Sequence, residues 1–317
     1  MSVIVCTIGL SEQQAERIRS AAPGYELLCG KDRELWQHRV QEAEIIIGWR
    51  RMFTDTCLGP ETKLRWVQSW SAGVDGFPLE QMAERGIHLT TTSGIHAYPI
   101  SETILAMMLG FTRNLHIYAR HQVAGRWVRT DPTLEMHGKT VGIIGFGEIG
   151  EETARLCKAF GMRVLGLRLS GRPSPYADQM HDPGGLDEVL AESDYVVVTL
   201  PLTRETRRLF GREQFARMKR SAMFINIGRG GLVDEQALIE ALRDGVIAGA
   251  GLDVFETEPL PEDSPLWSMD NVIITPHTAG GSGMYHERAL EIALRNLESY
   301  LQTGVPSVNL VDYAKQY

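Results

Sequence analysis

Three segments in the last third of the chain carry the side chains best suited to chemistry. Each follows a short apolar run typical of a buried strand, and in chain order they read NIGRGGLVDE (226–235), GLDVFETEPLP (251–261) and TPHTAGGS (275–282). Arg229 offers a planar fork of donors that fits a carboxylate and a neighbouring carbonyl. His277 can donate a proton near neutral pH, and Glu258 would stabilise its protonated form. Such a set can hold a 2-keto acid and protonate the oxygen formed when a hydride reaches the carbonyl carbon.

Each of these residues also has a structural interpretation. Arg229 would be an ordinary surface arginine, and His277, which follows a proline, would be a structural histidine. Glu258 would be a loop acid, with Glu256 as the partner of the histidine. The carboxyl ends of parallel strands meet at one edge of a sheet, where such sheets bind ligands, and this shared position favours the chemical interpretation.

A glycine-rich turn supplies a place for a nucleotide cofactor. Gly145, Gly147 and Gly150 form a GxGxxG motif between the apolar run VGII and the helix-like run EETARLCKAFG. In that context the glycines permit a tight turn, and the N–H groups of the helix N-terminus face a pyrophosphate. The alternative is an ordinary strand-to-helix turn.

The region about 20 residues beyond the glycine turn bears on the choice between NAD and NADP. It reads LRLSGRPS (167–174) and contains Arg168, Ser170 and Arg172 but no acid. A carboxylate there would repel a 2′-phosphate, whereas guanidinium and hydroxyl groups would bind it. The sequence therefore favours NADP(H), with NAD possible, unless these arginines are only solvated loop residues.

Apolar runs alternate with helix-like segments along the whole chain, which predicts an α/β fold with parallel sheets. The expected strands are 3–6, 26–28, 44–48, 64–68, 87–90, 140–144, 163–167, 195–199, 222–226, 247–252 and 272–275, and the expected long helices are 99–123 and 286–303. We expect a doubly wound Rossmann dinucleotide-binding domain (99–283) inserted into a smaller flavodoxin-like substrate domain (1–98 plus 284–317). The crossings near residues 98 and 283 would form a hinge.

Composition limits the partners and the compartment. The formal charge of −8 argues against nucleic acid, and no apolar stretch approaches the ~20 residues of a membrane span. The four cysteines lack CxxC or metal-like spacing, so we expect reduced thiols, no metal site and a cytoplasmic protein.

The three segments in this order resemble the D-isomer-specific 2-hydroxyacid dehydrogenase family, which includes glyoxylate/hydroxypyruvate reductases and phosphoglycerate dehydrogenases. The resemblance spans essentially the whole chain and assigns the roles given above to Arg229, Glu258 and His277. It implies D stereochemistry. It also implies cofactor contacts at Glu148, Ile149, Leu200, Pro201, Thr206, Ile227, Gly228, Asp253 and Gly280. Asp253 would contact the nicotinamide side, although a structural carboxylate is an alternative.

The first domain offers groups for the substrate. The segment SAGVD (71–75) follows the strand-like run LRWVQ, and its small residues leave backbone N–H groups open to a carboxylate. The resemblance places that carboxylate near Ala72 and Gly73. Trp49 and Arg50 would line the far wall of the pocket, although Trp49 suits a core position equally well.

The resemblance also predicts a homodimer. The helix from Pro99 and the loop 125–138 resemble the dimerisation arm of the family, so a partner chain would cover Arg126, Trp127 and Leu134. The sequence thus predicts an NADP(H)-preferring 2-ketoacid reductase. The alternatives are an NAD(P)-sensing corepressor of the C-terminal-binding-protein type, and an NAD-dependent phosphoglycerate dehydrogenase.

Overall fold

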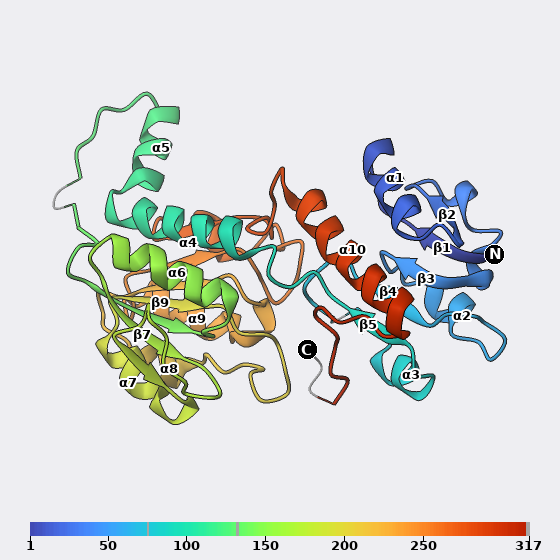
Figure 1. Cartoon of the computed structure of the whole chain (residues 1–317). Coiled ribbons are helices and arrows are strands. Elements are labelled where there is room, and N and C mark those ends of the chain that lie inside the picture. The colour runs from blue at the N-terminus through green and yellow to red at the C-terminus, as the bar shows by residue number, and fades with distance from the viewer. Residues whose placement is uncertain (75, 131–132, 315–317) are drawn as a thin grey trace. The chain divides into compact units, whose positions relative to one another are not determined.

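Two parallel β-sheets form the framework of the computed structural model, which describes residues 1–74, 76–130 and 133–314 (Figure 1). Each sheet belongs to one compact unit. Unit 1 comprises Met1–Ile95 and Ser282–Tyr317, and unit 2 comprises His96–Gly281. The divisions lie within three residues of the boundaries predicted after residues 98 and 283.

The sheet of unit 1 has the strand order β2-β1-β3-β4-β5 within the described residues, and all its pairs are parallel. This is the flavodoxin-like doubly wound order that we predicted. The five predicted strands are confirmed as β1 (Ser2–Cys6), β2 (Tyr25–Cys29), β3 (Ala43–Ile47), β4 (Trp66–Gln68) and β5 (His88–Thr90).

Helices cover both faces of this sheet, because its strands are apolar on both sides. On one face, α1 (Glu12–Ala21) and α10 (Tyr285–Thr303) pack over Ile4, Cys6 and Ile45. α2 (Phe53–Cys57) and α3 (Leu79–Glu84) contribute to the core on the other face. The last helix of the chain therefore belongs to the unit formed by the first strands, and its red end lies beside β4 in Figure 1, where Tyr300 packs on Trp66.

The sheet of unit 2 has the order β12-β11-β10-β9-β6-β7-β8 within the described residues, all parallel. Its strands are β6 (Thr140–Ile144), β7 (Arg163–Leu167), β8 (Gln179–His181), β9 (Tyr195–Val198), β10 (Met223–Asn226), β11 (Gly249–Leu252) and β12 (Val272–Ile274). The six predicted strands are confirmed, but β8 was missed. It has three residues at the sheet edge and no apolar run, so only its pairing with β7 identifies it.

Helices on two faces also enclose the sheet of unit 2. α4 (Ala97–Thr112) and α6 (Glu148–Ala159) lie against each other and cover one face (Figure 1). The other face is covered by α7 (Leu186–Glu192), α8 (Arg212–Arg217) and α9 (Glu235–Arg243). Within the described residues, no helix has the length and apolar character needed to cross a bilayer.

The helix predicted over 99–123 is wrong as a single element. The structure forms α4 and then α5 (Leu115–Val123), separated at Asn114, whose φ of 55° is left-handed. Asparagine tolerates this conformation better than most residues, so the chain turns there and α5 projects from the sheet.

Candidate active site

The predicted reactive residues of unit 2 lie at one edge of its sheet. Arg229 follows β10, Glu258 lies beyond β11, and His277 lies beyond β12. These strands are neighbours in the order β12-β11-β10, and they are parallel. Their carboxyl ends therefore deliver the three loops to the same side of the sheet.

His277 and Glu258 are in direct contact. Nδ1 of His277 lies 2.7 Å from Oε2 of Glu258, and Oε1 of Glu258 accepts the backbone N–H of Phe255 at 3.0 Å. The alternative partner, Glu256, is held elsewhere, since it forms an ion pair with Arg208 at 3.2 Å. About half of the His277 side chain is exposed, at 51%, so its other ring nitrogen can reach a ligand.

Asp253 shapes the loop that carries His277. Its buried carboxylate accepts the Thr275 hydroxyl at 2.6 Å and the backbone N–H groups of Thr278 and Ala279. The backbone carbonyl of Asp253 also accepts the N–H of His277, whose φ is 53°. These contacts match the structural role that the sequence left open for Asp253.

The loop that carries Arg229 is braced by a residue that sequence reasoning missed. The buried Asn226 side chain accepts the N–H of Gly228 at 3.1 Å and donates to the carbonyl of Arg229 at 3.0 Å. The Arg229 guanidinium donates to the Gly228 carbonyl at 2.8 Å. The position of Asn226 at the end of an apolar strand was a signal for this role, because a buried amide there must find partners.

Gly230 joins the Arg229 loop to the loop after β11. A Cβ at this position would lie 1.8 Å from the carbonyl oxygen of Phe255, which real contacts never allow. Only glycine permits this approach of the two backbones. It therefore sets the spacing between Arg229 and the segment that leads to Glu258.

His96, which the sequence did not indicate, lies beside this edge. Burial lowers the pKa of His96, and the positive charge of Arg229 lowers it further. The His96 imidazole is therefore neutral at neutral pH. A Cβ on Gly280 would lie 2.8 Å from the His96 ring, so the predicted cofactor residue Gly280 packs directly against it.

The glycine turn has the form that a pyrophosphate site requires. Gly145 has a φ of 105°, and a Cβ there would meet the backbone of Thr199 and Leu200. A Cβ on Gly150 would meet the Gly145 carbonyl at 2.5 Å, whereas Gly147, the N-cap of α6, faces open space. The turn thus packs tightly inward and leaves the helix N-terminus open to an anion. These residues fit a dinucleotide.

Arg168 follows β7 as predicted, but its guanidinium is already engaged. It donates to the carbonyls of Arg172 and Pro173 and forms an ion pair with Glu151 at 3.3 Å. It therefore orders the loop 168–173, in which Ser170 and Arg172 remain exposed.

The remaining predicted cofactor residues surround the same turn. Leu200 and Pro201 follow β9, and the Thr206 hydroxyl donates to the Pro201 carbonyl at 2.7 Å and so closes that loop. Glu148 and Ile149 begin α6. Ile227 is buried after β10, directly before Gly228.

The predicted substrate residues belong to unit 1, at the carboxyl ends of β3 and β4. Trp49 packs against Phe53 and Phe77, with ring centroids 5.5 and 6.0 Å apart, so one side of its ring belongs to the core. Its indole N–H has no hydrogen-bond partner within the described residues. Arg50 is exposed and donates to the Thr7 carbonyl at 3.1 Å.

The loop after β4 is held by serines. Ser69 accepts the N–H of Ser71, and the Ser71 hydroxyl donates to the Gly73 carbonyl at 3.1 Å. Ala72 is exposed and Gly73 is partly exposed, as a carboxylate cradle requires. Asp75, the last residue of the SAGVD motif, lies outside the described residues.

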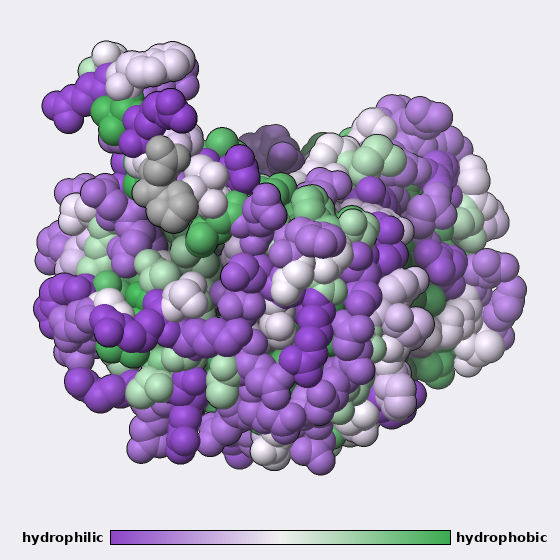
Figure 2. Space-filling model, turned by 90° about the vertical axis from the view of Figure 1, so that its left-hand side faces the viewer, coloured by the Kyte–Doolittle hydropathy of each residue, from purple (hydrophilic) through white to green (hydrophobic). Residues whose placement is uncertain are grey.

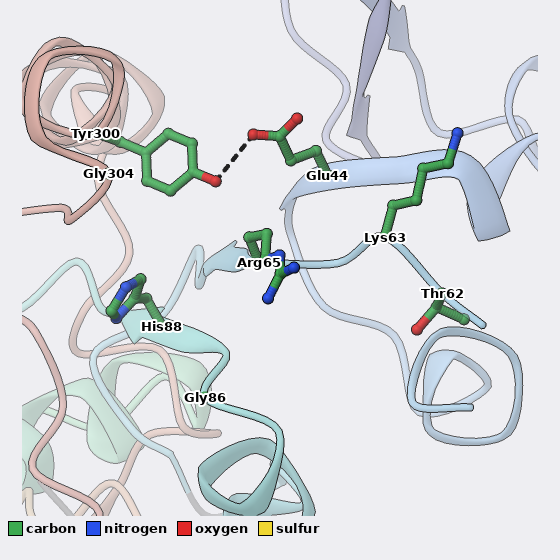
Figure 3. Close-up of a pocket in the computed structure, with 8 residues that line it drawn as sticks. All are labelled: Glu44, Thr62, Lys63, Arg65, Gly86, His88, Tyr300 and Gly304. Carbon is green, nitrogen blue, oxygen red and sulfur yellow. Dashed lines mark hydrogen bonds between the residues drawn. The ribbon is translucent and has the colours of Figure 1, made fainter. Parts of the chain in front are cut away.

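A cavity of about 650 Å³ in unit 1 is a different feature (Figure 3). It lies at the amino ends of β3, β4 and β5, opposite the predicted substrate loops. Although Lys63 and Arg65 line it, Glu44 does too, and Glu44 accepts the hydroxyl of Tyr300 at 2.9 Å. Its position at the sheet end opposite the loops that follow β3 and β4 separates this cavity from the predicted substrate residues.

Comparisons with known proteins show the family of the chain. The family model described as "D-isomer specific 2-hydroxyacid dehydrogenase, NAD binding domain" matches residues 105–279. The chain is 39% identical over 279 residues to glyoxylate/hydroxypyruvate reductase B of Yersinia pestis, covering 86% of this chain and 85% of that protein. The chain belongs to the D-isomer-specific 2-hydroxyacid dehydrogenase family.

Solved structures extend the similarity to the whole fold of this dehydrogenase. A family protein from Aeromonas salmonicida is 34% identical, with a TM-score of 0.86 over 98% of this chain and 99% of that one. An NADPH-dependent glyoxylate/hydroxypyruvate reductase from Sinorhizobium meliloti, in complex with NADP and sulfate, is 29% identical, with a TM-score of 0.83 over 100% of both chains. The chain is therefore an oxidoreductase of 2-hydroxy acids that uses a nicotinamide cofactor, and its fold is the predicted one.

Replacing Gly230 with alanine tests the backbone contact in this dehydrogenase. We expect Gly230→Ala to lower the free energy of unfolding by about 1–3 kcal/mol or more, since the Phe255 backbone must move. Turnover should fall with it, because that backbone supports Glu258. Calorimetry and steady-state kinetics measure the two effects. The matched control is Gly211→Ala, whose Cβ would meet only Gln214 at 3.7 Å. Equal free energies of unfolding and equal turnover in the two variants would contradict the close contact assigned to Gly230.

Proposed function

We propose that this dehydrogenase reduces small 2-keto acids, glyoxylate and hydroxypyruvate among them, to D-2-hydroxy acids and prefers NADPH. The observation that carries the proposal is the 2.7 Å contact of His277 with Glu258 at the sheet edge that also carries Arg229. The names of the Yersinia and Sinorhizobium relatives support the substrate class.

The chain's own residues supply binding and the proton. Arg229 holds the substrate carboxylate and carbonyl and stabilises the negative charge that grows on the carbonyl oxygen. Nε2 of His277 donates the proton to that oxygen, since Nδ1 is taken by Glu258. The Glu258 carboxylate stabilises the imidazolium and fixes its orientation. The nicotinamide cofactor, with its pyrophosphate held at the glycine turn, would supply the hydride.

For unit 1, we propose substrate contacts at Trp49, Arg50, Ala72 and Gly73. The exposed backbone of Ala72 and Gly73 would receive the carboxylate. The guanidinium of Arg50 would face the rest of the substrate, and the Trp49 ring would line the wall beside it. The chain segments that lead from one unit to the other, near residues 95 and 281, would serve as a hinge.

Steady-state kinetics of keto-acid reduction test the proton donor. We expect Glu258→Gln to lower kcat/KM for the keto acid, because a neutral amide orients and stabilises the proton-donating ring less well than a carboxylate does. His277→Ala should reduce turnover by about 10²–10⁴-fold with NADPH binding retained. Arg229→Ala should raise KM and lower kcat together.

The control for these variants is Glu256→Gln, which removes the neighbouring carboxylate that binds Arg208 instead. The kcat/KM of this variant should stay close to that of the unmodified enzyme. An unchanged kcat/KM in Glu258→Gln would contradict the pairing. The reverse assay, in which 3-phosphoglycerate is oxidised with NAD⁺ and the reduced cofactor is read at 340 nm, separates the reductase from a phosphoglycerate dehydrogenase. A corepressor would show little turnover with every substrate.

We propose that the loop 168–173 selects NADPH. Ser170 and the exposed Arg172 would contact the 2′-phosphate, and Arg168 would hold the loop in place and add charge. Relatives in complex with NADP or NADPH support this choice.

Cofactor kinetics test this selection. We expect the unmodified enzyme to have the higher kcat/KM with NADPH. Arg172→Ala should lower it with NADPH by about 5- to 150-fold, the equivalent of about 1–3 kcal/mol for a charge-assisted contact, and leave NADH nearly unaffected. Arg243→Ala, an exposed arginine on α9, is the matched control. Equal use of both cofactors by the unmodified enzyme would overturn the proposal.

We also propose a homodimer formed through α5 and the loop 125–138, of which residues 131–132 lie outside the described part. The side chains of Val123 and Trp127 are 93% and 97% exposed, and Leu134 is 44% exposed. Figure 2 shows hydrophobic atoms among hydrophilic ones on the segment that projects beside the grey atoms. A partner would cover these groups and Arg126.

The four free cysteines agree with a cytoplasmic enzyme.

Light scattering at micromolar protein tests the assembly. We expect twice the monomer mass, and Trp127→Glu should shift the population to monomers because the charge cannot be buried without a partner. Leu301→Glu, an exposed apolar position on α10, is the control and should remain dimeric. A fully active monomer of the unmodified chain would rule out the proposal.

A further inference from the structure

Two cysteines lie side by side on the edge of the unit 1 sheet. Cys6 ends β1 and Cys29 ends β2, and the two are direct partners in the parallel register. Adjacent strands are about 4.8 Å apart, within the Cα range of disulfides. Both thiols are directed to the same acceptor, since the Sγ atoms lie 3.9 and 3.7 Å from the carbonyl oxygen of Ile8.

The two thiols differ in access. Cys6 is fully buried against α1 and α10, whereas Cys29 is partly exposed on the edge strand β2. A hydrogen bond from Cys6 lowers the pKa of Cys29, and the same bond together with burial raises the pKa of Cys6. An accessible thiol that ionises more readily, backed by a protected one, is the arrangement found in peroxide-sensitive pairs.

From this geometry we infer that Cys29 and Cys6 form a reversible oxidation site that hydrogen peroxide converts to an intrachain disulfide. The Cys29 thiolate attacks one peroxide oxygen, the O–O bond breaks, and hydroxide leaves as water after taking a proton. The Cys6 sulfur then attacks the Cys29 sulfenic acid. The S–S bond forms, the S–O bond breaks, and a second water leaves with the Cys6 proton. Two thiols are oxidised, and one peroxide is reduced to two waters.

Oxidation would also act on the segment after β1. The Ile8 carbonyl loses both thiol donors, because a disulfide carries no proton. This segment is the one that holds Arg50, whose guanidinium donates to the Thr7 carbonyl, while the Thr7 hydroxyl donates to the Gly48 carbonyl. The effect on catalysis rests on the proposed substrate role of Arg50, and it predicts a higher KM for the keto acid with kcat less affected.

The test uses the full-length enzyme treated with a small molar excess of hydrogen peroxide. We expect a mass loss of about 2 Da per chain and a Cys6–Cys29 linkage in non-reducing peptide maps, both reversed by dithiothreitol. Cys57 and Cys157 are buried and should remain thiols. Cys6→Ser should leave a sulfenic acid on Cys29 that dimedone traps, and Cys57→Ser should still form the bridge.

Mass spectrometry of the unmodified chain decides the inference even if the Cys6 variant does not fold. A linkage between chains, a linkage through Cys57 or Cys157, or over-oxidation of Cys29 without a bridge would overturn it. A bridged enzyme with an unchanged KM would overturn only the connection to Arg50. Because the mass readout needs no turnover, it stands apart from the test of the reductase proposal.

Discussion

The buried carboxylate of Asp253 is the constraint on which the site in unit 2 depends. An isolated charge in the interior is costly, and the chain offsets that cost with one hydroxyl and two backbone N–H groups from the segment after β12. The segment folds back over β11 so that these donors reach the carboxylate. In this fold His277 has a left-handed backbone conformation. The imidazole then meets Glu258, so a buried carboxylate determines where the proposed proton donor lies.

Close backbone approaches connect this loop to its neighbours. Gly230 allows the loop after β10 to touch the backbone at Phe255, and Gly145 allows the glycine turn to touch the end of β9. Because a methyl group would fill either contact, the distances between the loops are set by main-chain atoms and not by adjustable side chains. Reacting groups held in this way need little reorganisation as charge develops.

Local charge opposes the charge of the whole chain. The net charge is −8, yet the edge of the unit 2 sheet carries Arg229 beside a neutral His96. Glu258 lies near, but its charge is directed to His277, and Glu256 is neutralised by Arg208. Arg229 therefore offers an anionic substrate a positive group at this edge, although the surface as a whole repels anions weakly at physiological ionic strength.

The sequence by itself determined both sheets almost strand for strand, because continuous apolar runs must be buried on both faces. It also predicted that Arg229, Glu258 and His277 lie at one sheet edge, since residues that follow parallel strands share an edge. The sequence did not predict the three-residue strand β8 or the break at Asn114. Pairing with β7 defines the first, and a single left-handed residue produces the second.

Only the tertiary structure decided among residues with the same chemistry. It paired His277 with Glu258 and not Glu256, gave Asp253 its loop contacts, and showed that Arg168 is bound to carbonyls of its own loop. It also brought Asn226 and Gly230 into the site and placed Cys6 beside Cys29. Residue type and spacing along the chain specify which strand a group follows. Which neighbour it meets depends on distances across the sheet, and these exist only once the strands have paired.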